Sequence, residues 1–252
     1  MADVERRTAK LDSVELSYER EGRGEPLVLL HGMGGCARDW QHFGRDAFAR
    51  AYQLIAVDAR GHGHSTNALP ELTHAQCARD LLALLDRLGL ARVRAIGLSM
   101  GGNTLLHAAS LAPERFASLV VVSAVASYGD EARAIMRGVS LDDRAHPEAE
   151  WREMRGRHAH GDDQIRALWR AMRALADDRS DMAFTPADLA KIQARTLVVY
   201  GDRDPLCPLA GGELLARAIP NAELWVVPGG GHGPIALEHA APFAARALAF
   251  LR

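Results

Sequence analysis

The Gly-Leu-Ser-Met-Gly motif at residues 97–101 lies between a short apolar run and a helical pattern, and this arrangement limits the folds open to the chain. β-Branched and apolar residues lead into it from Val93, and the residues from Asn103 onward are typical of a helix. A strand that turns directly into a helix strains the backbone of the residue at the turn, and the flanking glycines avoid Cβ clashes. Ser99 would then stand clear of the sheet beside the free N–H groups of a helix N-terminus. A Gly/Ser-rich turn without chemical function is the alternative interpretation.

Apolar runs alternate with helical patterns along most of the chain. Predicted strands cover residues 14–18, 27–30, 53–57, 119–122, 195–200 and 224–227, besides the run that enters the serine motif. Predicted helices cover residues 39–50, 73–88, 103–109, 186–191, 212–219 and 237–251. This alternation predicts an α/β fold with a mostly parallel sheet and helices on both faces. Binding sites in such sheets gather at the carboxyl ends of the strands, so we expect one site built from several loops.

Residues 126–185 break the alternation, and we call them the helical insertion. The segment is charged and has no β-rich run. An apolar stripe at helical spacing predicts one helix with a buried face. Its members are Ile165, Leu168, Trp169, Met172 and Leu175. Two roles stay open for this stripe, namely core packing and the covering of a substrate cleft.

Composition excludes several classes of function. The formal net charge of −2 over 252 residues, with no basic stripe, argues against nucleic-acid binding. No apolar run approaches the about 18 residues that span a bilayer, and the charged N-terminus leads into no signal-like segment. Cys36, Cys77 and Cys207 lack metal-type spacing, so we expect a cytoplasmic, reducing compartment. A disulfide between Cys36 and Cys207, near two of the site loops, is disfavoured by that compartment.

A serine nucleophile needs a base, and the base needs an acceptor that orients it. His232 lies in a glycine-rich loop after a predicted strand and is the candidate base. Asp202 and Asp204 follow the preceding strand, and we prefer Asp204 as the acid because it lies further from the strand. The order Ser99, Asp204, His232, each at a strand carboxyl end, matches the α/β-hydrolase template.

The chain resembles the α/β-hydrolase superfamily, in its lid-bearing esterase, lactonase and peroxidase-like branch. The motifs that carry the resemblance are residues 31–34 (HGMG), 58–65 (DARGHGHS), 97–101 (GLSMG), 201–204 (GDRD) and 231–232 (GH). The resemblance implies a twisted, mostly parallel sheet of about eight strands. It further implies a core of residues 1–125 and 186–252, with residues 126–185 as a helical cap.

The same resemblance implies the roles of the site residues. Ser99 would be the nucleophile, His232 the base and Asp204 the orienting acid, while the backbone N–H groups of Met33 and Met100 would form the oxyanion hole. No metal or organic cofactor is expected. In the related haloalkane dehalogenases and epoxide hydrolases, the nucleophile at this strand-to-helix turn is an aspartate. The serine at position 99 therefore excludes these two classes of enzyme.

The leading hypothesis is a serine hydrolase of a small or medium carboxylic ester, lactone or thioester. Gly32, Trp151, Trp169 and Met172 are the candidate pocket residues. One alternative is hydrolysis of a carbon–carbon bond in ring-fission products, with arginines of the insertion binding a substrate carboxylate. The other alternative is a receptor-like protein that binds a small ligand with little turnover. The expected partner is a small molecule, not nucleic acid or membrane, and a homodimer formed through the cap is left open.

Two histidine-bearing segments are expected to be structural. Residues 58–65 would hold the oxyanion loop and the serine turn in place, with a direct substrate role for His62 or His64 as the lesser alternative. His158 and His160 are two positions apart and cannot share a helix face, which argues against a metal site there.

Overall fold

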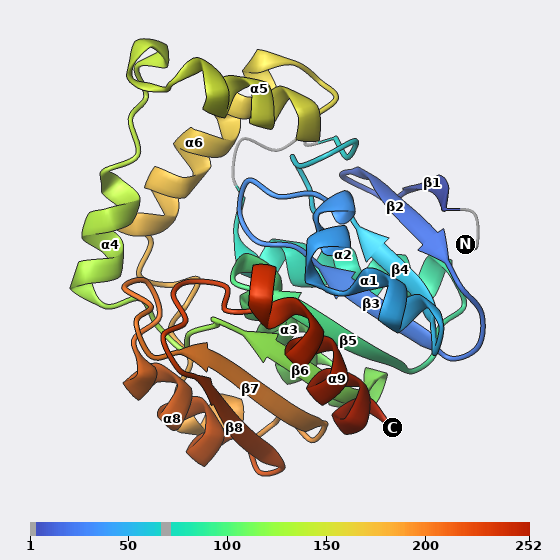
Figure 1. The fold of residues 1–252 in the computed structure, drawn as a ribbon. Helices are drawn as coiled ribbons and strands as arrows, with labels where there is room; N and C mark the ends of the chain where they lie inside the picture. The colour runs from blue at the N-terminus through green and yellow to red at the C-terminus, as the bar shows by residue number, and fades with distance from the viewer. Residues whose placement is uncertain (1–3, 67–71) are drawn as a thin grey trace.

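The structure is a computed structural model that describes residues 4–66 and 72–252, so that residues 1–3 of the charged N-terminal stretch lie outside it. Its centre is an eight-stranded sheet in the order β1-β2-β4-β3-β5-β6-β7-β8 (Figure 1). The strands are β1 (Glu5–Lys10), β2 (Glu15–Glu21), β3 (Pro26–Leu30), β4 (Gln53–Val57), β5 (Val93–Leu98), β6 (Phe116–Val122), β7 (Arg195–Gly201) and β8 (Ala222–Val227). β2 runs antiparallel to β1 and β4, and the other pairs are parallel. The predicted mostly parallel sheet is confirmed.

The central strands are buried on both faces, as their apolar runs predict. In β3, Leu27 and Leu29 pack into one core cluster, and Val28 and Leu30 pack into the other. Helices α2 (His74–Arg87), α3 (Met100–Leu111) and α8 (Leu209–Ala218) cover one face. Helices α1 (Arg45–Ala49) and α9 (Ala240–Leu251) cover the other, and the short α7 (Pro186–Leu189) leads into β7.

Two elements of the N-terminal part differ from the sequence prediction. The sequence pattern misses β1, because this edge strand is charged and mostly exposed and so lacks an apolar alternation. The single helix predicted over residues 39–50 is wrong: a 3-10 helix, Ala37–Phe43, is followed by α1. Gly44 separates the two with a φ of 87°, and a Cβ at this position would lie 2.7 Å from the Cβ of Ala244 in α9. The predicted helix is therefore interrupted at Gly44, where α9 approaches the backbone closely.

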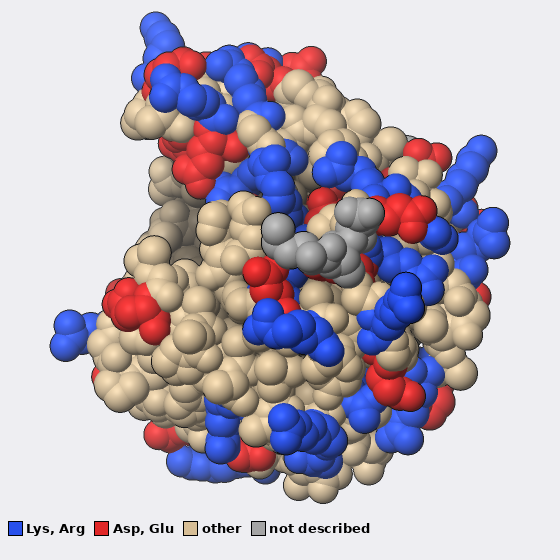
Figure 2. Space-filling view, turned by 45° about the vertical axis from the view of Figure 1, so that its right-hand side comes forward, with Lys and Arg blue, Asp and Glu red and all other residues tan. Residues whose placement is uncertain are grey.

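The helical insertion connects β6 to β7 and extends beyond the carboxyl ends of the strands (Figure 1). It contains α4 (Asp130–Arg137), α5 (Glu148–Arg157) and α6 (Asp162–Asp177). Part of the stripe on α6 packs in the core, and part of it lines a cavity. Ile165 is fully buried within the insertion, whereas Met172 and Leu175 line a cavity above the sheet. Figure 2 shows Lys and Arg next to Asp and Glu over this upper part of the molecule.

The segment 58–65 is tied to its surroundings by buried polar contacts. Asp58 accepts from the backbone N–H groups of Ala37 and His64 at 2.7 and 3.0 Å. Arg60 is fully buried and binds both carboxylate oxygens of Asp80 in α2, at 2.6 and 2.7 Å. These contacts support the interpretation of the segment as a scaffold.

None of the helices in the described part of the chain is long and apolar enough to cross a membrane.

Candidate active site

Ser99 is the single residue between β5 and α3. Its φ of 51° lies in the left-handed region, which is strained for a residue with a Cβ. A Cβ on Gly97 would overlap the carbonyl of Gly101, and a Cβ on Gly101 would overlap the carbonyl of Leu30. The two glycines are therefore required by close backbone approach, as the sequence predicts.

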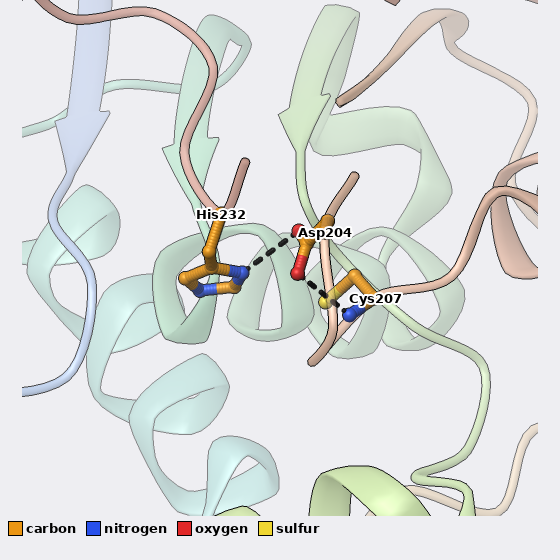
Figure 3. A group of neighbouring side chains, drawn as sticks. All are labelled: Asp204, Cys207 and His232. Carbon is orange, nitrogen blue, oxygen red and sulfur yellow. Dashed lines mark hydrogen bonds and ion pairs between the residues drawn. The ribbon is translucent and has the colours of Figure 1, made fainter. Parts of the chain in front are cut away.

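The structure brings the three predicted catalytic residues together. Nε2 of His232, from the loop after β8, lies 2.9 Å from Oγ of Ser99. Nδ1 of the same ring lies 2.8 Å from Oδ2 of Asp204, from the loop after β7 (Figure 3). The side chains of His232 and Asp204 point toward each other across these two loops.

Asp204 is buried but held in the ionised form. Burial raises the pKa of this carboxyl, yet the hydrogen bond from His232 and that from the backbone N–H of Cys207 lower it below the ordinary value. Oδ1 accepts from the backbone N–H groups of Leu206 and Cys207, both at 2.9 Å. Because a carboxylate only accepts, Nδ1 of His232 carries the hydrogen and Nε2 is free to accept the proton of Ser99.

Asp202, the alternative acid, takes a different position. Its Oδ1 accepts from the backbone N–H of Gly229 at 2.7 Å. It therefore links the loop after β7 to the loop after β8, as expected of a turn residue.

The two predicted oxyanion donors adjoin Ser99. Met100 is the first residue of α3, so its backbone N–H has no acceptor within the helix. Met33 belongs to the loop after β3, where a Cβ on the neighbouring Gly32 would lie 3.5 Å from the Cβ of Ser99. Met33, Met100 and Ser99 line the same cavity. Their role as an oxyanion hole stays a prediction.

A cavity of about 350 Å³ opens above Ser99, within the range usual for small-molecule sites. Gly32 and Met172 line it, as predicted. Most of its other walls are apolar, from Phe43, Leu98, Met136, Leu175, Leu206 and Ala236.

A second cavity, of about 390 Å³, shares Gly32, Met33 and Met172 with the first, and Trp169 lines it. Trp151 is not among the residues that line either cavity, so its prediction as a pocket residue needs correction. Its indole instead packs edge-on against Trp169 at 4.8 Å between ring centres. Two consecutive helices of the insertion bury the tryptophans against each other.

Residues 27–246 of the chain match the alpha/beta hydrolase family. The chain belongs to this family. It is 34% identical over 248 residues to the dihydrolipoyllysine-residue acetyltransferase component of the acetoin cleaving system of Pseudomonas putida. That match covers 91% of this chain but only 64% of the relative, so the chain spans less than two thirds of that protein.

Two further relatives are matched over nearly their whole length. The chain is 30% identical over 278 residues to 2-hydroxy-6-oxononadienedioate/2-hydroxy-6-oxononatrienedioate hydrolase 2 of Pseudomonas putida, covering 98% of this chain and 94% of that one. The enol-lactonase from Burkholderia xenovorans LB400 superposes with a TM-score of 0.76 at 25% identity, covering 97% of this chain and 99% of that one. The named relatives thus include an acetyltransferase component, a hydrolase and a lactonase, and their activities differ.

Sequence reasoning missed four polar residues that line the first cavity, namely His74, Asn103, Ser123 and Tyr128. Asn103 follows Ser99 by one helical turn, and this spacing could have predicted that its side chain lies near the site. His74 and Tyr128 reach the cavity only through the packing of α2 and the start of the insertion.

The arginines of the insertion do not line the first cavity. Arg155 binds Asp162, and Arg166 binds Asp143, at 2.8 and 2.7 Å. Arg157 lines the second cavity and is paired with Asp39 at 3.1 Å. None of the described residues that line the first cavity is Lys or Arg.

Asp204, Cys207 and His232 each offer one ligand atom, and these atoms lie within 4.8 Å of one another (Figure 3). The thiol of Cys207 donates to the carbonyl of Ser123 at 3.1 Å, and burial raises its pKa, which keeps it protonated. A metal would have to displace that proton and the hydrogen bond between Asp204 and His232. That the protein needs no metal stays a prediction. Cys36, Cys77 and Cys207 are free thiols.

Proposed function

We propose that this hydrolase cleaves a small, uncharged carboxylic ester or lactone through an acyl-enzyme on Ser99. The hydrogen-bonded series Ser99, His232, Asp204, of which the first two line the cavity, carries the proposal. Its geometry is that of a nucleophile with a base that is oriented by a third group.

In the first half of the reaction, Oγ of Ser99 attacks the substrate carbonyl carbon while Nε2 of His232 takes its proton. The negative charge that forms on the carbonyl oxygen is met by the N–H groups of Met33 and Met100. Collapse of the tetrahedral intermediate breaks the ester C–O bond. His232 gives its proton to the departing alkoxide, and the acyl group stays on Ser99.

In the second half, His232 takes a proton from a water molecule that attacks the acyl carbon. Expulsion of Oγ, with return of the proton from His232, releases the carboxylic acid. Asp204 stabilises the imidazolium form of His232 in both halves and fixes the ring orientation.

The cavity wall favours an uncharged substrate. A dicarboxylate, such as the substrate in the name of the hydrolase from Pseudomonas putida, would bring charges into a cavity whose described lining has no Lys or Arg. Burial of an unpaired carboxylate is strongly unfavourable. This argues for an ester or lactone over a charged ring-fission product.

The test is hydrolysis of p-nitrophenyl esters from acetate to decanoate by wild type, Ser99→Ala and Ser110→Ala. We expect a burst of one p-nitrophenol per protein followed by turnover, with a fall in kcat/KM toward decanoate. Ser99→Ala should lose at least about a thousandfold in kcat, whereas Ser110→Ala, at the far end of the same helix, should match wild type. Folded protein without any Ser99-dependent turnover would refute the proposal. Ring-fission substrates would then test the carbon–carbon alternative, and ligand screening would test the receptor alternative.

A further inference from the structure

The cavity above Ser99 holds a polar cluster that the proposed acyl transfer does not use. It consists of His74, Asn103 and Tyr128, which line the cavity, and Asp181 behind them. His74 and Asn103 are 1% and 2% exposed. Polar side chains so deeply buried are expected to be hydrogen-bonded.

Asp181 fixes the hydrogen positions of His74. Its Oδ2 lies 2.6 Å from Nδ1 of His74 and accepts from the backbone N–H of the same residue at 2.8 Å. Burial raises the pKa of Asp181, but these contacts outweigh burial and lower it to about 2. The ionised carboxylate requires a hydrogen on Nδ1, so in the neutral ring Nε2 is an acceptor with one lone pair.

The orientation of the Asn103 side-chain amide is fixed by a backbone hydrogen bond. Its Oδ1 accepts from the backbone N–H of Val125 at 2.9 Å, which leaves its two amide hydrogens for the other side chains of the cluster. Nδ2 lies 2.8 Å from Oη of Tyr128 and 3.3 Å from Nε2 of His74. Oη of Tyr128 lies 3.2 Å from the same Nε2.

These contacts leave one donor in excess. The amide of Asn103 and the hydroxyl of Tyr128 offer three hydrogens, but Oη takes one of them and Nε2 of His74 takes one. The third hydrogen has no acceptor among these side chains, and all three side chains line the cavity. It is therefore available to an oxygen atom of a bound substrate.

We propose that His74, Asn103 and Tyr128 form a second subsite, which binds an uncharged oxygen atom of the substrate. This inference rests on the proposed ester or lactone hydrolysis and narrows its substrate class. The backbone N–H of Asn103 donates to the carbonyl of Ser99 at 2.9 Å, and both residues line the cavity, so the bound oxygen lies roughly one helical turn from the carbonyl that Ser99 attacks. The substrate class is therefore an oxygenated ester or lactone, with a keto, hydroxyl or ether oxygen a few bonds from the scissile carbonyl.

The test compares two p-nitrophenyl esters of nearly equal shape, the 4-oxopentanoate and the 4-methylpentanoate. We expect wild type to prefer the oxo ester by more than the ratio of the two rates with hydroxide alone. Tyr128→Phe, which removes only the hydroxyl, should lower the ratio of the two kcat/KM values about tenfold. Tyr52→Phe removes the same atom on the other face of the sheet and should leave the ratio unchanged. An unchanged ratio in folded Tyr128→Phe protein overturns the subsite.

Two further arms separate the alternatives. Preference for the monosuccinate ester over the oxo ester would overturn the uncharged assignment and point to a carboxylate. If no ester is hydrolysed, the proposed function fails, and the subsite is tested by binding alone. Ser99→Ala protein should then bind methyl 4-oxopentanoate more tightly than methyl 4-methylpentanoate, with the preference lost in Ser99→Ala/Tyr128→Phe. Equal affinities for the two methyl esters would overturn the subsite as well.

Discussion

His158 should make the stability of this protein sensitive to mild acid. Its Nδ1 accepts from the backbone N–H of Gly63 at 3.0 Å, and its Nε2 lies 3.1 Å from the carbonyl of Gly34. The ring thus connects the end of α5 to both the scaffold segment and the loop after β3. Only the neutral ring can accept at Nδ1 and donate at Nε2. Burial is the main cause that lowers the pKa of His158 to about 4.

The expected loss of stability follows from the difference between the pKa of His158 in the folded chain and that in the unfolded chain. An unfolded histidine has a pKa of about 6.5. Below that pH, His158 binds a proton in the unfolded chain but not in the folded chain. Stability is therefore fully present above pH 6.5 and falls as the pH approaches the folded value. Between pH 6.5 and 4.5 the contribution of His158 is a loss of about 2 kcal/mol in the free energy of unfolding.

Urea unfolding of wild type and His158→Ala at pH 7.0, 5.5 and 4.5 measures this contribution. At pH 7.0 the variant should be less stable by about 2–4 kcal/mol, because it loses two hydrogen bonds and a buried ring. That difference should shrink by about 2 kcal/mol at pH 4.5, where the wild type carries the protonation cost and the variant does not. His160→Ala, at an exposed site two residues away, serves as the control and should follow the wild-type pH dependence. Parallel curves for wild type and His158→Ala would refute the reasoning.

Three shorter predictions concern the site and its support. Gly97→Ala should destabilise the fold by several kcal/mol, because the new Cβ would overlap the carbonyl of Gly101, whereas Gly129→Ala, which has open space, should be tolerated in thermal unfolding. Asp204→Asn should lower kcat on p-nitrophenyl esters by about 10³–10⁴ with the far-UV circular dichroism unchanged, and near-wild-type turnover would contradict its orienting role. Asp80→Ala should cost about 3–5 kcal/mol in urea unfolding, because it removes the two charge-assisted hydrogen bonds that Asp80 accepts from the fully buried Arg60, and a loss below 1 kcal/mol would contradict this.

The sequence alone determined the elements that follow from local rules. The apolar run of β3 requires burial on both faces, and the glycines around Ser99 permit the close turn from β5 into α3. Because the carboxyl ends of parallel strands meet at one edge, the chain order Ser99, Asp204, His232 was enough to predict that these side chains converge.

The tertiary structure decided what depends on partners distant in the chain. The break at Gly44 follows from the approach of Ala244, and β1 forms because β2 offers it a free edge. Trp151 lies inside the insertion because Trp169 covers it. The polar wall of the cavity joins His74 to Asp181, which is 107 residues away. A one-dimensional pattern records which face of an element is apolar, but it does not record which side chain of another element packs on that face.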